Sequence, residues 1–199
     1  MIIIGIDPGV SGAVAVGNLT DLHTVFDLVT QPGSARGEAP GTGKKTFNLI
    51  DGAALADRLA PWVGVGGDDR VVAFIEVPIP SAGNGIRAAS QTSRILGRIE
   101  GVLAALCIEV VCIHPSKWRG FHGIGGGGDT LTDAEVYKGN KERSLDLAVS
   151  LYPKAAHYFR PPPLPKKDGT PRAVAPAARH DRADAVLIWA YGARLMSSR

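Results

Sequence analysis

The chain has 199 residues, of which 45% are hydrophobic and 21% charged, and its formal net charge is +3. This length and composition are typical of one globular domain with a substantial core, and they exclude a disordered or fibrous chain. No apolar run approaches the ~20 residues that span a bilayer, and the N-terminus enters a predicted strand without a signal-peptide pattern. We therefore expect a single cytoplasmic domain over residues 1–199, with no membrane partner.

Apolar patterning predicts five strands, over residues 2–7, 12–18, 22–29, 71–77 and 109–114. Apolar residues at helical spacing predict four helices, at about 49–62, 87–106, 139–152 and 179–196. The Gly- and Pro-rich segment 31–48 is predicted to be a loop or a loose hairpin extension, and loops are also predicted for 120–133 and 154–178. Three strands followed by alternating helices and strands predict an α/β fold, a mixed five-stranded sheet with helices on both faces.

Two acidic residues stand at the ends of apolar strands. Asp7 ends the run IIIGID and precedes Pro8-Gly9, so it would serve equally well as a ligand or as a hydrogen-bond acceptor for its own turn. Glu76 interrupts the apolar run VVAFIEV near the carboxyl end of its strand, where open α/β sheets bind ligands. The alternative for Glu76 is a buried carboxylate with a local partner.

A second acidic pair begins the last predicted helix. Asp181 and Asp184 are three residues apart, which places both on one helix face. The alternative is a capping role, because the N-terminus of a helix favours negative charge. His180 precedes them and would act as a ligand, a general base or a solvent-facing residue; the sequence does not separate these roles.

These carboxylates predict a metal centre if the fold brings them together. Unpaired carboxylates about 4 Å apart would repel by roughly 4 kcal/mol per pair at an intermediate dielectric. Oxygen ligands favour Mg²⁺ or Mn²⁺, and the absence of a Cys/His cluster argues against zinc. The two cysteines, Cys107 and Cys112, are interpreted as buried thiols. Two-metal carboxylate sites commonly hydrolyse phosphodiesters.

Positive charge is concentrated in one segment, since Lys154 to Arg179 contains six Lys or Arg residues and one Asp. That segment is a candidate surface for contacting phosphates. The glycine run at 123–128 lacks the Lys-Ser/Thr of a phosphate-binding loop and is interpreted as a flexible loop. Trp118 is interpreted as an aromatic packed under a loop, with stacking on a base as the alternative.

Five segments together resemble a known family. They are IGIDPGVSGAVAV, FIEVP, LGRIEGVLAAL, VVCIHPSKWR and HDRADA. In this order they resemble the RuvC-type Holliday-junction resolvases of the RNase H-like superfamily, particularly the phage-borne branch. The resemblance implies an RNase H-like fold and a catalytic, metal-binding set of Asp7, Glu76, Asp181 (or His180) and Asp184.

The resemblance also implies partners and products. It implies a homodimer in which each active site nicks one strand of branched DNA, with two Mg²⁺ ions per site, or Mn²⁺ in their place. The nicks would carry 5′-phosphate and 3′-hydroxyl ends. Arg119 and Lys141 match residues that contact the scissile backbone. The full set expected to contact DNA is Lys117, Arg119, Lys138, Lys141, Lys166, Lys167, Arg172 and Arg179.

The sequence therefore predicts a Mg²⁺-dependent, structure-selective endonuclease acting on junctions and forks. An RNA-directed nuclease of the same fold and a non-catalytic DNA-binding protein are the alternatives. The apolar stripe on helix 87–106 predicts a two-fold interface, unless that helix simply packs on the sheet.

Overall fold

A mixed five-stranded sheet forms the centre of the molecule. The computed structural model describes residues 1–33, 47–64, 70–77, 86–125, 133–161 and 179–198. The strands are β1 (Ile2–Asp7), β2 (Ala13–Gly17), β3 (Leu22–Asp27), β6 (Val71–Glu76) and β7 (Glu109–Ile113), in the spatial order β3-β2-β1-β6-β7. The first three form an antiparallel meander, and β6 and β7 run parallel to β1 and to each other. This confirms the predicted fold class, including the meander followed by alternating helices and strands.

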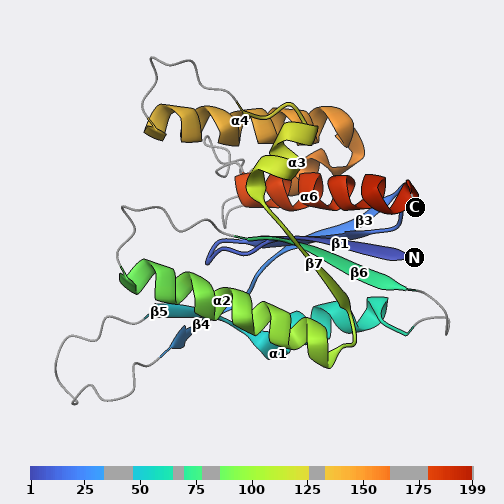
Figure 1. Cartoon of the computed structure of the whole chain (residues 1–199). Helices are drawn as coiled ribbons and strands as arrows, with labels where there is room; N and C mark the ends of the chain where they lie inside the picture. The colour runs from blue at the N-terminus through green and yellow to red at the C-terminus, as the bar shows by residue number, and fades with distance from the viewer. Residues whose placement is uncertain (34–46, 65–69, 78–85, 126–132, 162–178, 199) are drawn as a thin grey trace, which may run out of the picture.

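Helices cover both faces of this sheet (Figure 1). On one face lie α1 (Gly52–Leu59) and α2 (Ile86–Ala105). On the other lies α6 (His180–Ser197), with α3 (Pro115–Phe121), α4 (Asp133–Leu151) and α5 (Ala156–Phe159) around it. Single turns of 3₁₀ helix cover Ala60–Trp62 and Pro153–Ala155. Within the described ranges, no helix combines the length and apolarity that crossing a membrane requires.

Glycines let α6 lie directly on the sheet. A Cβ atom on Gly5 of β1 would fall 2.3 Å from the Ala185 carbonyl oxygen and 2.3 Å from the Trp189 backbone nitrogen. A Cβ atom on Gly192 would fall 2.4 Å from the Phe74 ring. Only residues without a Cβ atom permit this approach. The close contact fixes the distance between the start of α6 and the end of β1.

The predicted start of the first helix was wrong. The helix expected at 49–62 begins at Gly52, because Asp51 caps it by accepting a 3.1 Å hydrogen bond from the Ala54 backbone nitrogen. The preceding residues form β5 (Phe47–Ile50), which pairs with β4 (Thr30–Gly33) in a separate two-stranded sheet. The segment 34–46 between them lies outside the described residues.

Two short helices were missed. The helix α3 begins at Pro115, a residue suited to the first helical turn, and the His114 side chain accepts a hydrogen bond from the Ser116 backbone nitrogen. The helix α5 occupies the start of the segment predicted as a loop at 154–178, of which residues 162–178 lie outside the described residues.

The apolar stripe of α2 is used inside the molecule. Ile95, Ile99 and Leu103 are buried in the core beneath the sheet. Packing on the sheet, the alternative explanation of the stripe, is therefore confirmed, and the stripe gives no support to a dimer. Cys107 and Cys112 are exposed, contrary to prediction: Cys107 ends a helical stretch with a positive φ of 56°, and Cys112 lies on the edge strand β7.

Candidate metal centre

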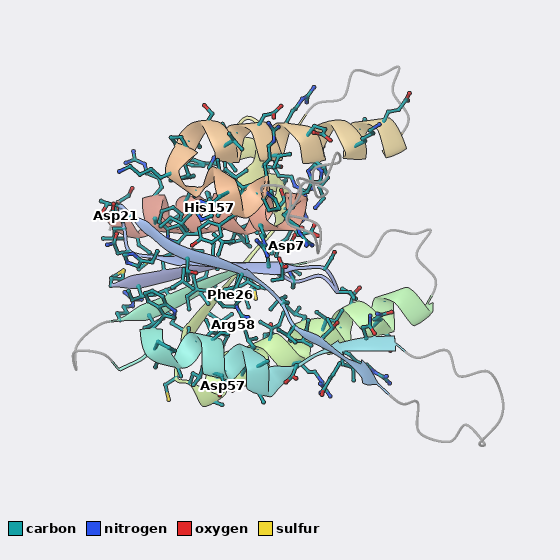
Figure 2. The ribbon with its side chains drawn as sticks, turned by 180° about the vertical axis from the view of Figure 1, so that it is seen from behind. Asp7, Asp21, Phe26, Asp57, Arg58 and His157 are labelled. Atoms are coloured by element: carbon teal, nitrogen blue, oxygen red, sulfur yellow. The ribbon has the colours of Figure 1, made fainter. Side chains whose placement is uncertain are left out.

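Three aspartates from two distant segments meet on the α6 face of the sheet. Asp7 ends β1, whereas Asp181 and Asp184 lie in the first turns of α6. One carboxylate oxygen from each residue lies within 4.8 Å of the other two. Figure 2 shows Asp7 where the sheet meets α6. The structure thus brings together three of the four carboxylates expected from the sequence. We call these residues the aspartate triad.

Asp184 is the most enclosed member of the triad, with 3% of the residue exposed. Its Oδ2 atom accepts a hydrogen bond from Lys141, but its Oδ1 atom is buried and has no hydrogen-bond partner among the described residues. A buried carboxylate oxygen without a partner carries a large desolvation cost. The arrangement fits a hard divalent cation such as Mg²⁺ or Mn²⁺, which oxygen ligands prefer. The triad is therefore a candidate metal site.

Lys141 of α4 reaches into the triad. Its Nζ atom donates hydrogen bonds of 2.8 Å to Asp181 Oδ1 and 2.8 Å to Asp184 Oδ2. Burial of the ammonium by itself lowers the pKa of Lys141, but the charges of Asp184 and Asp7 and the two hydrogen bonds outweigh it and raise the pKa well above its usual value. Lys141 is therefore cationic at neutral pH.

Burial and the neighbouring carboxylates make ionisation of Asp7 unfavourable. Burial raises the pKa of Asp7 well above its usual value, and the charges of Asp184, Asp181 and Glu76 raise it further. The charge of Lys141 acts in the opposite direction without cancelling these effects. A divalent cation would favour the ionised form of Asp7, so metal binding would be coupled to proton release.

Glu76 lies at the end of β6 beside the triad but outside the group of three ligand atoms. Its Oε2 atom accepts a 2.7 Å hydrogen bond from Trp118 Nε1, and its Oε1 atom lies 3.6 Å from Arg119 Nη2. The pKa of Glu76 is raised, chiefly by burial and also by the negative charge of Asp184. The charge of Arg119 and the hydrogen bond from Trp118 lower this pKa but do not cancel the rise. Glu76 therefore shares the electrostatic field of the triad while α3 holds its carboxylate.

His180 faces α4 rather than the triad. Its Nδ1 atom lies 3.2 Å from the Lys141 carbonyl oxygen, and its Nε2 atom lies 3.8 Å from Glu142 Oε1. Of the two candidates for the fourth site residue, Asp181 is the one that joins the triad. Asp181 is in the first turn of α6, and its carboxylate is engaged by Lys141.

A salt bridge that the sequence did not reveal ties α6 to the meander. Arg182 donates two hydrogen bonds to the Asp27 carboxylate, from Nε to Oδ1 at 2.5 Å and from Nη2 to Oδ2 at 2.8 Å. Its Nη1 atom donates a third hydrogen bond, of 3.1 Å, to the Tyr158 carbonyl oxygen. The hydrogen bonds from Arg182 lower the pKa of Asp27. This pairing holds the first turn of α6 against the end of β3.

A cavity of about 340 Å³ adjoins the triad. Its lining is rich in basic and polar side chains: Ser11, Asp27, Lys141, Arg179, His180, Asp181 and Arg182. The Asp27 carboxylate is already engaged by Arg182, whereas the exposed Arg179 makes no direct ion pair among the described residues and acts on Asp27 through its charge alone. The cavity is therefore suited to an anionic group.

The residues predicted to contact DNA are only partly described. Lys117, Lys138 and Arg179 are exposed, and Arg119 lies beside Glu76. Lys166, Lys167 and Arg172 lie outside the described residues, as do residues 126–128 of the glycine run. Trp118 is fully buried, as expected for an aromatic that packs rather than stacks on a base, but its hydrogen bond to Glu76 was not anticipated.

Comparisons with known proteins give structural similarity alone. The chain is similar to the structure of Thermus thermophilus RuvC in complex with a Holliday-junction substrate, with 13% identity, a TM-score of 0.46, and coverage of 98% of this chain and 96% of that one. It is also similar to a structure of Thermus thermophilus RuvC, with 15% identity, a TM-score of 0.47, and coverage of 98% and 97%. No family model matches the chain, and no curated protein matches it. At these identities and TM-scores, the similarity does not indicate a function.

Proposed function

We propose that this protein is a metal-dependent endonuclease that cleaves Holliday junctions and other branched DNA. The observation that carries the proposal is the aspartate triad, in which three carboxylates converge and the buried Asp184 Oδ1 has no hydrogen-bond partner among the described residues. Repulsion between such groups is relieved by cations, and clustered carboxylates that bind Mg²⁺ commonly serve phosphodiester hydrolysis.

The residues have distinct roles in this proposal. Asp7 and Asp184 are the central ligands, because they come from the close contact between β1 and α6, and Asp181 completes the triad. Glu76 is held beside them by Trp118 and Arg119, and we assign it to a second ion. When bound, two Mg²⁺ or Mn²⁺ ions would supply an activated water and stabilise the departing 3′ oxygen. The products would be nicks with 5′-phosphate and 3′-hydroxyl ends.

The preference for branched DNA depends on the motif resemblance to RuvC-type resolvases. The exposed side chains of Lys117, Lys138 and Arg179 would contact phosphates, with Arg119 and Lys141 nearest the scissile one. DNA affinity should then fall steeply with salt. We further propose a homodimer, with one active site for each of two strands, acting in the cytoplasm of a bacterial or phage-infected cell.

Cleavage of defined substrates tests this function. Purified protein is incubated with a labelled four-way junction, a replication fork and a linear duplex, in Mg²⁺, Mn²⁺ or EDTA. Paired nicks in the junction, lost with EDTA and in Asp184→Asn, would support the proposal. Asp57→Asn is the matched control, because Asp57 is exposed on α1, across the sheet from the triad (Figure 2). Its cleavage should equal that of the wild type.

Two other outcomes lead to different functions. Cleavage of RNA hairpins in preference to branched DNA would indicate an RNA-processing nuclease, since the carboxylates do not encode the sugar. Junction binding without cleavage in either metal would indicate a DNA-binding protein and would contradict the nuclease assignment.

A further inference from the structure

Lys141 occupies a position within the triad that a metal ion would need. Its Nζ atom lies 2.8 Å from an oxygen of Asp181 and 2.8 Å from an oxygen of Asp184, two of the three residues whose ligand atoms lie within 4.8 Å of one another. An ammonium ion at this distance engages the same carboxylates that a divalent ion would coordinate.

We propose that Lys141 is an internal cation that holds the triad together before metal binds and that must leave it when metal binds. This inference depends on the proposed function in one respect, metal binding at the triad. A divalent ion among these carboxylates would repel the ammonium strongly at such short distance, so the two cations exclude each other. Lysine suits the role because its charge is compact and its four-carbon stem is flexible.

The neighbouring cavity offers a destination for the displaced ammonium. Lys141 already lines the 340 Å³ cavity, together with Arg179, His180 and Ser11. A phosphate of the DNA backbone in this cavity would be attracted by Arg179 and by the released Lys141. Metal binding at the triad would thereby strengthen phosphate binding beside it, and phosphate binding would strengthen metal binding by the same factor.

Metal affinity measured without DNA tests the displacement. Mn²⁺ binding is followed by calorimetry and by the electron paramagnetic resonance signal of free Mn²⁺, for the wild type and for Lys141→Met. Because the variant has no ammonium to displace, it should bind Mn²⁺ about 5-fold or more tightly than the wild type, a typical coupling between two sites. Arg143→Met removes an exposed charge from the same helix and should leave the affinity unchanged.

An equal or weaker Mn²⁺ affinity in Lys141→Met would overturn the inference while leaving the metal site intact. The absence of Mn²⁺ binding in both proteins would overturn the proposed metal centre and this inference with it. The two failures are therefore distinguishable.

A measurement on the wild-type protein covers the case in which Lys141→Met does not fold. The ¹⁵N-labelled lysine ammonium groups are observed by NMR at low temperature. The Lys141 signal should be visible without metal, where hydrogen bonds slow its exchange with water, and should be lost or shifted when Mg²⁺ is added. A signal that Mg²⁺ leaves unchanged, under conditions where calorimetry shows that Mg²⁺ is bound, would overturn displacement.

Discussion

The indole nitrogen of Trp118 donates a 2.7 Å hydrogen bond to Glu76 Oε2. Trp118 is fully buried in α3, and Glu76 ends β6, so the bond joins the helix after β7 to the carboxyl end of the neighbouring strand. The same carboxylate lies 3.6 Å from Arg119 through its other oxygen. The short helix α3 therefore sets the orientation of Glu76 with two consecutive residues.

Trp118→Phe should separate this hydrogen bond from the packing of the ring. The variant keeps an aromatic side chain but removes the donor, so the pKa of Glu76 should rise further and Mg²⁺-dependent cleavage should fall. A hydrogen bond to a charged group contributes about 1.5–3 kcal/mol, which should appear as a loss of stability in urea unfolding, together with the cost of a smaller ring. Wild-type cleavage by a destabilised Trp118→Phe protein would show that Glu76 needs no orientation.

Gly5→Ala should damage the site without touching a functional side chain. The added Cβ atom would lie 2.3 Å from backbone atoms of α6, so the helix must move away from β1 and carry Asp184 with it. We expect the free energy of unfolding to fall by about 1–3 kcal/mol, the usual cost of overpacking. We also expect weaker Mn²⁺ binding, because Asp184 moves with the helix.

The control for Gly5→Ala is Gly97→Ala in the middle of α2. Nothing lies within 4 Å of a Cβ atom at that position, and alanine is favoured over glycine in helices by about 1 kcal/mol. This variant should be slightly stabilised and should bind Mn²⁺ as the wild type does. Equal behaviour of the two alanine variants would contradict the close contact between β1 and α6.

Asp27→Asn tests the salt bridge that holds α6. Because Arg182 lowers the pKa of Asp27 in the folded state, the bridge stabilises the protein above the unfolded-state pKa of about 3.9 and is lost as the pH falls through the lower folded value. Asp27 is 38% exposed and Arg182 is 21% exposed, so solvent screening limits the contribution to about 1 kcal/mol. The stability difference between wild type and variant should be present at pH 7 and should shrink towards pH 3. A difference that is constant across this range would contradict the assignment.

Asp7→Asn should stabilise the metal-free protein while removing metal binding. The pKa of Asp7 is raised in the folded state, so ionisation opposes folding. The free-energy cost of ionising Asp7 in the folded protein is absent below the unfolded-state pKa of about 3.9. This cost grows as the pH rises towards the pKa of Asp7 in the folded state, and it reaches its full value above that pKa. Thermal unfolding in EDTA should give a higher Tm for the variant at neutral pH and a smaller gain near pH 4. Added Mn²⁺ should raise the Tm of the wild type alone; a lower Tm for metal-free Asp7→Asn would show that Asp7 stabilises the fold.

Patterns local in sequence predicted much of this molecule. Asp7 and Glu76 stand out because each ends an apolar strand, and Asp184 because it precedes the apolar run AVLIWA. Three successive apolar strands followed by alternating helices and strands predicted the fold class, a mixed five-stranded sheet with helices on both faces. The Asp51 cap and the Pro115 helix start are sequence signals of a helix N-terminus that apolar spacing alone does not register.

Contacts between distant residues could not be predicted in the same way. Lys141 and Asp184 are 43 residues apart, Glu76 and Trp118 are 42 apart, and Asp27 and Arg182 are 155 apart. Nothing in their local sequence identifies these partners, because long polar side chains on helix surfaces usually face solvent. Likewise, the contacts of Glu76 with Trp118 and Arg119 depend on where α3 packs, which residue spacing does not encode.

The most direct test of the account is the anomalous diffraction of Mn²⁺ in crystals of the wild-type protein. We predict a peak within bonding distance of Asp7 and Asp184, with Asp181 beside it, a second peak on the Glu76 side, and Lys141 Nζ moved away from the triad. The account would be contradicted by a map that has no peak at Asp7, at Mn²⁺ concentrations that support cleavage, and that shows Lys141 still hydrogen-bonded to Asp181 and Asp184.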